Sequence, residues 1–311
     1  MRTHAAILFV ALAAVGCKKG AGTGGGGGGG GWLVGRSGLM AQIQDNGALG
    51  AGYDLGATEN LNAIACRNSG EAWVAGDAGT LLYTNDAGKT WVSQAVPTGA
   101  DLHALATQDT GPVFVAGDGA FLMSTDTGAH WASLGDATTR FTSVAAAQHG
   151  TTVLALDAGG GLWSYANGQL VKTNTIAGAH AVSVSPDGQT AVIAGAGLQL
   201  STDGGQHWLP LAVDATLEDA RVDDEANIVS VGKAGAIVNV AWGSTVSIQH
   251  VGTADLHTVH IKEWVEGDAV GYAAGAGGEV LVTEDLGATW TMGPNVGREV
   301  FSLDEIGDGH R

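Results

Sequence analysis

The chain has 311 residues and a formal net charge of −18, with 45% hydrophobic and only 14% charged residues. The acidic balance argues against a nucleic-acid partner, which would require a basic stripe, and against adhesion to anionic lipid headgroups by charge alone. The hydrophobic share is large enough for a sizeable core.

Residues 1–17 have the pattern of an export signal. A weakly basic start is followed by the apolar run Ala5–Val15, which is too short to span a bilayer, and small residues precede Cys17. The end resembles a bacterial lipoprotein signal, whose cysteine is acylated, although Ala14 stands where that pattern has leucine. We therefore expect an exported protein that is lipid-anchored to a bacterial membrane through Cys17. Cleavage of an ordinary signal peptide nearby is the alternative.

Residues 18–31 predict a flexible linker because they end in the glycine run Gly24–Gly31 and have no apolar periodicity. A glycine run can cradle phosphates only between a strand and a helix, and neither flanks this one. The only other cysteine, Cys66, lies in an apolar run and is typical of a small buried hydrophobe.

An eight-residue motif, Ser/Thr-x-Asp-x-Gly-x-Thr/His-Trp, occurs at 84–91, 124–131, 201–208 and 283–290. In a tight turn the aspartate can accept amide hydrogen bonds, the glycine can adopt a positive φ, and the tryptophan can cover the turn. The motif resembles the Asp-box (BNR) hairpin of β-propellers. The residues with these structural roles are Asp86, Gly88, Trp91, Asp126, Gly128, Trp131, Asp203, Gly205, Trp208, Asp285, Gly287 and Trp290.

Two further landmarks recur with a period of about 40 residues, which is typical of a propeller blade. One is a Gly-rich hairpin such as Val74–Gly79, and the other is an apolar opening strand such as Leu61–Ile64. The repeats cover approximately residues 61–101, 102–140, 141–179, 180–216, 217–255 and 256–299. The third and fifth repeats lack the Asp-box, and the third has an Asn-Gly hairpin pair in its place.

The two ends of the repeat region complement each other. Residues 32–60 contain the second to fourth strands of a repeat, and residues 300–311 contain only an opening strand. Closing a ring with these pieces leaves no free sheet edge between the ends. We expect one domain over residues 32–311, an all-β, seven-bladed β-propeller of four-stranded antiparallel blades, closed by N- and C-terminal strands that share one blade. A β-sandwich would not explain the repeat period.

An enzyme is the alternative class, since Asp-boxes also occur in sialidases and other glycoside hydrolases. A sialidase-like site needs several arginines that converge on a carboxylate, together with a Tyr–Glu pair. The chain has few arginines, it lacks the Arg-Ile-Pro motif of that family, and no constellation selects a carboxylate pair. We expect no catalytic residues. The alternative function is a sialidase-like glycoside hydrolase or a carbohydrate-binding propeller.

Residues 32–311 as a whole, together with the lipoprotein-type signal, resemble the photosystem II assembly and stability factor family. The resemblance implies a non-enzymatic scaffold that binds another protein, here at the cell envelope. The arginine-rich patch of the photosynthetic members is not apparent in this acidic chain, so their partner is not carried over. We expect a monomer with a protein partner, for which a basic surface would be complementary, and a membrane contact through the lipid.

Ligands of propellers usually meet the face where the opening strands begin, which we call the mouth. The repeats place a candidate rim there, with three histidines one step inside: Asp77, Asp101, Asp118, Asp157, Asp255, Glu299, His103, His180 and His257. An acidic rim would concentrate a basic partner or a cation, although solvated Asp/Gly turns are the alternative. The histidines come from separate repeats around a wide opening. We expect them to be hydrogen-bonded polar residues, with no metal and no cofactor.

Overall fold

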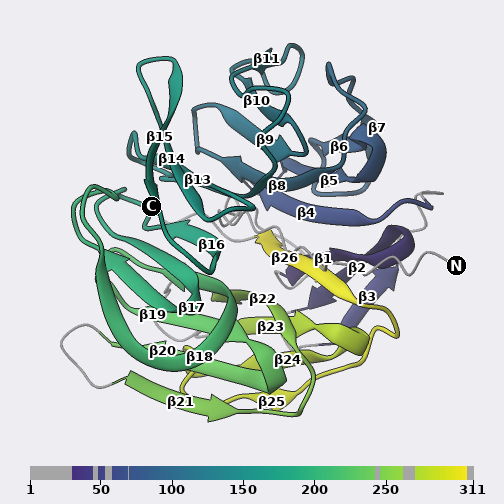
Figure 1. Ribbon diagram of the computed structural model, residues 1–311. Coiled ribbons are helices and arrows are strands. Elements are labelled where there is room, and N and C mark those ends of the chain that lie inside the picture. Colours follow the sequence, from purple (N-terminus) through teal and green to yellow (C-terminus); the bar gives the residue numbers. More distant parts are fainter. Residues whose placement is uncertain are drawn as a thin grey trace, which may run out of the picture.

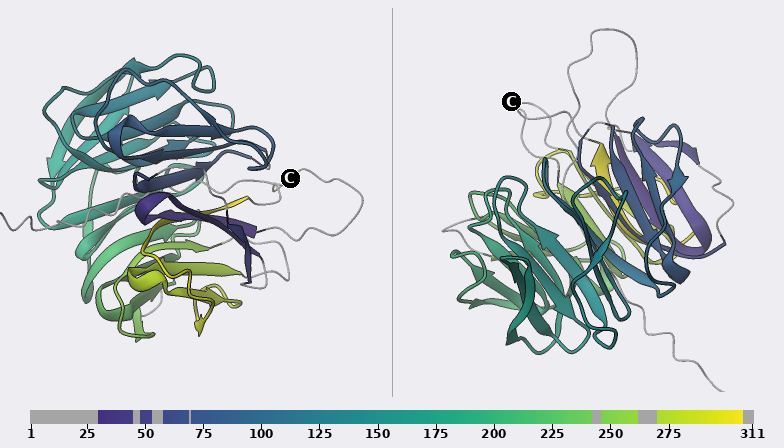
Figure 2. Two further views of the ribbon diagram at one scale, coloured as in Figure 1. Left: turned by 90° about the vertical axis from the view of Figure 1, so that its right-hand side faces the viewer. Right: turned by 90° about the horizontal axis from the view of Figure 1, so that it is seen from above.

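The computed structural model describes residues 30–44, 48–52, 58–68, 70–241, 246–261 and 270–306. In these ranges the regular elements are β-strands and short 3₁₀ helices, and the sheets radiate around a common centre (Figure 1). Figure 2 shows the same ring from two other sides. No helix in these ranges has the length and hydropathy needed to cross a membrane. The chain is an all-β propeller built from antiparallel sheets.

Six sheets form the ring in the described part of the chain. From the centre outward, the sheet that contains both ends has β26 (Val300–Ile306), β1 (Gly30–Gly35), β2 (Leu39–Gln44) and β3 (Leu49–Gly52). The next two have β4 (Leu61–Cys66), β5 (Ala72–Gly76), β6 (Leu81–Thr84) and β7 (Val92–Ser93), then β8 (Leu102–Thr107), β9 (Val113–Gly117), β10 (Ala120–Ser124) and β11 (Ala132–Ser133).

The other three sheets follow in chain order. The first has β12 (Phe141–Ala146), β13 (Val153–Asp157), β14 (Gly161–Ala166) and β15 (Gln169–Thr175). The second has six strands, β16 (Ala179–Val184), β17 (Ala191–Ser201), β18 (Leu209–Val222), β19 (Ile228–Gly232), β20 (Ala236–Val240) and β21 (Val246–His250). The third has β22 (Leu256–Ile261), β23 (Gly271–Gly275), β24 (Val280–Thr283) and β25 (Thr291–Met292). Within the described ranges, four hairpins contain single-turn 3₁₀ helices, η1 (Arg36–Gly38), η2 (Asp77–Gly79), η3 (Lys233–Gly235) and η4 (Ala276–Gly278).

The predicted number of seven four-stranded blades is wrong, because five of the six sheets have four strands and one has six. The cause is β18, a continuous strand of 14 residues. Its first part pairs with β17 and its second part with β19, so the fourth and fifth repeats share one sheet. Neither Gly nor Pro occurs between Leu211 and Val222, so nothing in the sequence interrupts the strand there.

The innermost strands are apolar and contact one another around the centre. Every residue of β4, β8 and β12 is buried, as expected for strands covered on both faces. The contacts run in a closed circle through β4, β8, β12, β16, β18, β22 and β26. Aromatic rings extend the core outward, with centroids 5.1 Å apart for Phe121 and Phe141 and 5.4 Å apart for Phe141 and Trp163. Such edge-to-face pairs stabilise a core beyond their buried area.

The two ends of the chain meet in one sheet. β26 pairs antiparallel with β1, with Leu303 opposite Leu33, and β2 and β3 follow outward. The last two residues of the glycine run, Gly30 and Gly31, belong to β1 rather than to the linker predicted over residues 18–31. The C-terminal strand thus supplies the innermost strand that the N-terminal segment lacks, and this pairing closes the ring.

Polar side chains also link neighbouring innermost strands. The carboxylate of Asp219 is fully buried and accepts hydrogen bonds from the amides of Ala220 and of Val259 in the next repeat (Oδ2···N 2.7 Å). Arg221 Nη1 lies 3.3 Å from its Oδ1. Burial raises the pKa of Asp219 to about 7, although Arg221 and the two amides stabilise the charge. In other repeats Ser143, Thr258 and Ser302 use hydroxyl groups in the same way, toward Val182, Leu303 and Ile64.

Candidate functional site

The carboxylates of the candidate rim come from two kinds of loop. Asp77, Asp118 and Asp157 lie at the turns that follow the second strands, whereas Asp101, Asp255 and Glu299 directly precede innermost strands. Hydrogen bonds from Asp77 N to Asn60 O (3.0 Å) and from Asp118 N to Asp101 O (2.9 Å) hold these two kinds of loop together. All six residues therefore lie at the same end of the strands.

Backbone geometry gives two rim carboxylates a structural role. Ala78 in η2 has a φ of 54° and Ala234 in η3 a φ of 53°, a left-handed conformation that costs an alanine roughly 1 kcal/mol. The amide of Ala78 donates to Asp101 Oδ1 at 2.9 Å, and that of Ala234 donates to Asp255 Oδ1 at 3.0 Å. Each carboxylate lies in the loop that leads to the next repeat. It therefore fastens one repeat to the hairpin of the preceding one.

Asp118 is paired with two basic side chains. Its Oδ1 lies 2.9 Å from His103 Nε2 and 2.9 Å from Arg140 Nε. Arg140 comes from the loop before β12, and a backbone bridge joins it to Asp118. The guanidinium offsets the acidic charge at this point of the rim.

A second cluster surrounds Lys233. Its ammonium lies 2.9 Å from Glu218 Oε1 and 3.1 Å from Asp255 Oδ2, and His180 Nδ1 lies 3.5 Å from Glu218 Oε2. Burial acts to raise the pKa of Glu218, but the hydrogen bonds from His180 and Lys233 outweigh it and lower the pKa to about 2. The hydrogen bond with Glu218 raises the pKa of His180. Glu218 therefore remains ionised at neutral pH.

Glu299 joins the third histidine to the hairpin η1. Its carboxylate forms an ion pair with Arg36 (Nε···Oε2 2.9 Å) and lies 3.2 Å from His257 Nε2. The His257 side chain is fully buried, and this burial lowers its pKa. Arg36 also lies over the ring of Phe301, 5.8 Å from its centroid.

The two remaining rim carboxylates are held within or next to their own repeat. Asp77 accepts hydrogen bonds from the side-chain amides of Asn60 (2.9 Å) and Asn62 (2.7 Å). Asp157 is buried. It accepts from Gly159 N, Gly161 N, Trp163 Nε1 and Lys172 Nζ. Asp157 therefore stabilises its own hairpin.

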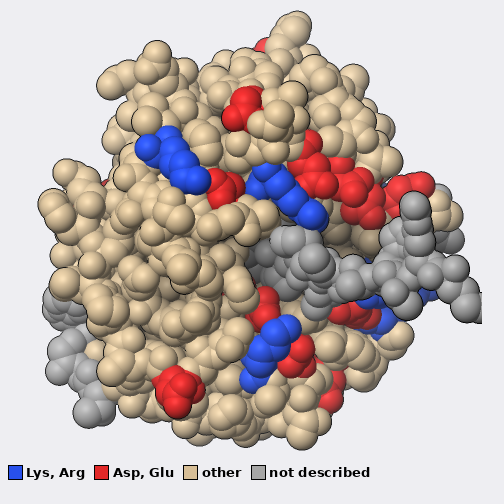
Figure 3. Space-filling model, viewed as in Figure 1, with Lys and Arg blue, Asp and Glu red and all other residues tan. Residues whose placement is uncertain are grey.

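The rim is a belt of paired charges rather than an uncompensated acidic surface. Figure 3 shows Lys and Arg side chains beside Asp and Glu around the centre of one face. The repeats place Arg36, Arg140, Lys233 and Glu218 at the mouth as well, at positions equivalent to those of the rim residues, but the sequence prediction did not count them in the candidate rim. The three histidines contact three different carboxylates. Among the described residues, no group of three or more His, Cys, Asp or Glu is arranged to hold a metal ion.

The Asp-box aspartates bind their own turns. In the second box, Asp126 Oδ1 accepts from Ser124 Oγ and His130 N, both at 2.9 Å, and Oδ2 lies 2.6 Å from His130 Nδ1. The hydrogen bond from the His130 side chain is the main cause that lowers the pKa of Asp126 to about 2. Gly128 N donates to Ser124 Oγ at 2.8 Å. The same contacts recur around Asp86, Asp203 and Asp285.

Box glycine and tryptophan residues also have local roles. A Cβ on Gly88, which has a φ of 78°, would lie 2.3 Å from the Trp32 ring of the neighbouring sheet, so a larger residue would push the two apart. The indole N–H groups of Trp208 and Trp290 donate to the carbonyls of Gly205 and Gly287, at 3.0 Å in both cases.

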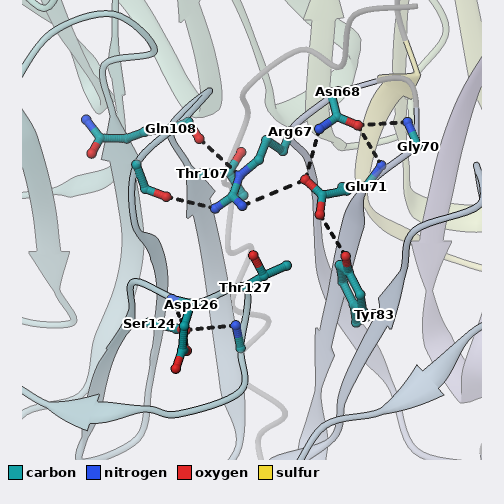
Figure 4. Close-up of polar contacts among 12 residues, drawn as sticks. Arg67, Asn68, Gly70, Glu71, Tyr83, Thr107, Gln108, Ser124, Asp126 and Thr127 are labelled. Carbon is teal, nitrogen blue, oxygen red and sulfur yellow. Dashed lines mark hydrogen bonds and ion pairs between the residues drawn. The ribbon is translucent and has the colours of Figure 1, made fainter.

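A polar network lies at the opposite ends of the strands from the mouth, and Figure 4 shows it close to the Asp126 turn. Arg67 donates from Nε to Gln108 O (3.1 Å) and from Nη2 to Gly111 O (2.9 Å), which ties the first repeat to the second. Glu71 accepts a hydrogen bond from the Tyr83 hydroxyl at 2.7 Å. Burial lowers the pKa of Arg67. These groups are occupied by structural contacts.

The radial antiparallel sheets and the four repeated turns define an Asp-box β-propeller. Residues 28–171 match the model of a family described as photosynthesis system II assembly factor YCF48. This match confirms the resemblance to the photosystem II assembly factor family. No curated protein matches the chain in sequence.

Solved propellers resemble the chain over most of its length. YCF48 from Cyanidioschyzon merolae matches with a TM-score of 0.66 and 15% identity, over 84% of this chain and 92% of that one. A structure of YCF48 bound to D1 peptide matches with a TM-score of 0.61 and 16% identity, over 85% and 89%. The WD40 β-propeller domain of Doa1 gives 0.64 and 13%, over 88% and 90%. At sequence identities of 13% to 16%, the structural likeness shows the fold alone.

Proposed function

We propose that this chain is a non-enzymatic scaffold that binds a protein partner at its mouth, in the manner of an assembly factor. The observation that carries the proposal is the match of residues 28–171 to the YCF48 family model. A solved YCF48 is bound to a D1 peptide, so a propeller of similar fold takes a protein ligand. The D1 peptide is the ligand of that YCF48, and our proposal takes over only the class of ligand, a protein segment.

The chemistry of the rim supports a partner with basic residues. Arg36, Arg140 and Lys233 offset only part of the acidic charge on the rim, and the whole chain has a net charge of −18. A basic partner would be attracted to this field and could exchange with the internal cations for the same carboxylates. The ion pairs of Arg140 with Asp118 and of Lys233 with Asp255 are exposed on both sides, and such pairs are typically worth less than about 1 kcal/mol each, so this exchange costs little.

The location of the scaffold is part of the proposal. We infer that the chain is exported and tethered to a bacterial membrane by acylated Cys17. Residues 1–29, with Cys17, lie outside the described residues, so the inference depends on the sequence pattern alone. Mass spectrometry of the mature protein is expected to find an acylated N-terminal cysteine, and Cys17→Ser is expected to release the protein from the membrane. An unmodified N-terminus in the wild-type protein would refute the anchor.

Capture of the partner with matched variants tests the binding function. The rim variant combines Asp118→Asn, Asp255→Asn and Glu299→Gln. The control neutralises three exposed carboxylates at the opposite ends of the strands from the mouth by Asp224→Asn, Glu225→Gln and Glu284→Gln, and changes the net charge by the same amount. We expect cross-linking from membranes to capture one stoichiometric partner with the wild type and the control, and about tenfold less with the rim variant. Equal capture by both variants, at equal thermal stability, would contradict binding at the rim.

Glycan hydrolysis is the outcome that would overturn the scaffold function. A glycosidase needs one carboxyl group that is protonated near neutral pH to act as the general acid. The pKa values of Glu218 and Asp126 are lowered to about 2, so neither can supply that proton. Asp219, whose pKa is raised to about 7, is fully buried between innermost strands and is not accessible to a glycan. Turnover of a glycan that disappears on a single carboxylate substitution would establish the enzyme instead.

A further inference from the structure

The third repeat has a much longer outer strand than three of the four repeats with an Asp-box; the fourth repeat is the exception, because its box leads into β18. β7, β11 and β25 each follow a box turn and have only two residues, whereas β15 has seven. The third repeat replaces the box with the two-residue turn Asn167-Gly168, whose φ values are 52° and 80°. Strand pairing therefore resumes at once, with Ala166 opposite Gln169. In the described part of the chain, β14 is the only strand that pairs with β15, which lies at the periphery of the ring (Figure 1).

The register shows which backbone groups of β15 face outward. The pair that closes a two-residue hairpin is hydrogen-bonded, and hydrogen-bonded and non-bonded pairs then alternate along the ladder. Val171, opposite Ser164, is a bonded pair, whereas Leu170 and Lys172 are opposite Tyr165 and Trp163 in non-bonded pairs. The N–H and C=O groups of Leu170 and Lys172 therefore point away from β14. These are the groups that another strand would use.

The usual protection of a free edge is weak here. Edges are commonly blocked by an outward-pointing lysine, by proline or by a bulge. The Lys172 ammonium instead turns back onto its own sheet, 3.1 Å from Asp157 Oδ2 and 5.8 Å from the centroid of the Trp163 ring. β15 contains no proline, and Val171 is 52% exposed. A bulge occurs only after Lys172, where Thr173 has no partner in the ladder.

We propose that the β15 edge accepts an extended, uncharged segment of the protein partner by β-strand addition. This inference rests on the proposed function, because the edge continues from the rim: Lys172 contacts the rim residue Asp157, and Thr175 pairs with Gly161 at the same hairpin. A partner seated at the mouth can lay a neighbouring stretch of chain along β15, and the two weak contacts then reinforce each other.

The chemistry of the edge selects the occupant. Lys172 and Asp157 neutralise each other, so the edge offers no net charge to attract a charged segment. The exposed Val171 favours a β-branched or apolar residue opposite it. A second copy of the chain fits less well, because each copy carries −18 charges and a pairing over a few residues buries far less than the roughly 1,200 Å² of a stable interface.

Hydrogen–deuterium exchange of the full chain with the probe peptide acetyl-Thr-Val-Thr-Val-Thr-amide tests the proposal. Lys172→Pro removes an outward N–H without touching the ladder to β14, and Lys172→Ala is its matched control because it keeps that N–H. At millimolar peptide we expect exchange in 169–175 to slow by about tenfold in the wild type and in Lys172→Ala, but not in Lys172→Pro. The same peptide N-methylated at alternate residues is expected to have no effect.

Three results would overturn the inference. The first is that the peptide does not slow exchange in the wild type, and the second is that it slows exchange equally in Lys172→Pro. The third is that exchange slows with rising protein concentration alone and light scattering gives a doubled mass, which would identify a second copy as the occupant. Val171→Lys covers the case in which Lys172→Pro fails to fold, since it keeps every backbone group and is expected to weaken peptide binding about fivefold. Failure of the edge leaves partner capture through the rim intact, so it is distinguishable from failure of the proposed function.

Discussion

The Asp-box turns and the rim both depend on carboxylates, but the hydrogen-bond and ion-pair partners of these carboxylates lie at different distances along the chain. In a box, the partners of Asp126 are Ser124 and His130 of the same turn. At the rim, Asp255 accepts from Ala234 and Lys233 of the preceding hairpin, and Glu299 pairs with Arg36 from the other end of the chain. The box stabilises one hairpin, whereas the rim and the buried Asp219 connect separate repeats.

The largest effect is expected where a buried carboxylate connects repeats. Asp219→Ala leaves two buried amides without an acceptor and removes the counter-charge of Arg221. We expect the free energy of unfolding in urea to fall by about 3–5 kcal/mol. Ser302→Ala, which removes a single hydroxyl link, is the matched control and is expected to cost about 1 kcal/mol. An equal loss of unfolding free energy in the two variants would show that the Asp219 carboxylate connects the repeats no more strongly than a single hydroxyl group does.

A smaller loss is expected inside a box. The Thr84 hydroxyl is buried, accepts from Gly88 N at 3.0 Å and donates to Asp86 Oδ1 at 2.8 Å. Thr84→Val leaves the Gly88 amide unsatisfied and is expected to lower the free energy of unfolding by about 2 kcal/mol in urea denaturation. The exposed Thr90→Val should have a clearly smaller effect. A larger loss in Thr90→Val would mean that the outer half of the turn holds the box.

The response of individual pKa values to a substitution at the rim distinguishes the rim from the Asp-box turns. Lowered pKa values in the folded state mean that Glu218 and Asp86 stabilise the fold above the unfolded pKa values near 4, and that this contribution is lost as the pH falls toward about 2. Lys233→Ala removes one of the hydrogen bonds to Glu218. In an NMR titration we expect the pKa of Glu218 to rise by about one unit while that of Asp86 stays at about 2. A shift of both would contradict the separation.

The smallest effect is expected when one box type is converted into the other. His130 Nδ1 lies 2.6 Å from Asp126 Oδ2, and in the first box Thr90 Oγ1 occupies the equivalent place, 2.7 Å from Asp86 Oδ2. His130→Thr should therefore keep the hydrogen bond and shift the thermal midpoint by no more than about 2 °C. A fall of several degrees in calorimetry would show that the imidazole makes contacts that the threonine cannot replace.

The same contrast explains what the sequence could predict. The box turns and the repeat period are local patterns, and they led to an all-β propeller with four-stranded antiparallel blades. The blade count was wrong because β18 passes from one repeat to the next without an interruption in the sequence. The pairing of Arg36 with Glu299 spans 263 positions, and only the closed ring brings the two together. Contacts of this kind depend on topology, which residue spacing alone does not show.

Hydrogen–deuterium exchange of the full chain with its captured partner tests the central claim, that the mouth binds a protein, most directly. Binding at the rim predicts slower exchange in the hairpins 76–79 and 232–235, with no change in the Asp-box turn 84–91. Protection confined to the box turns, with the rim hairpins unchanged, would contradict it.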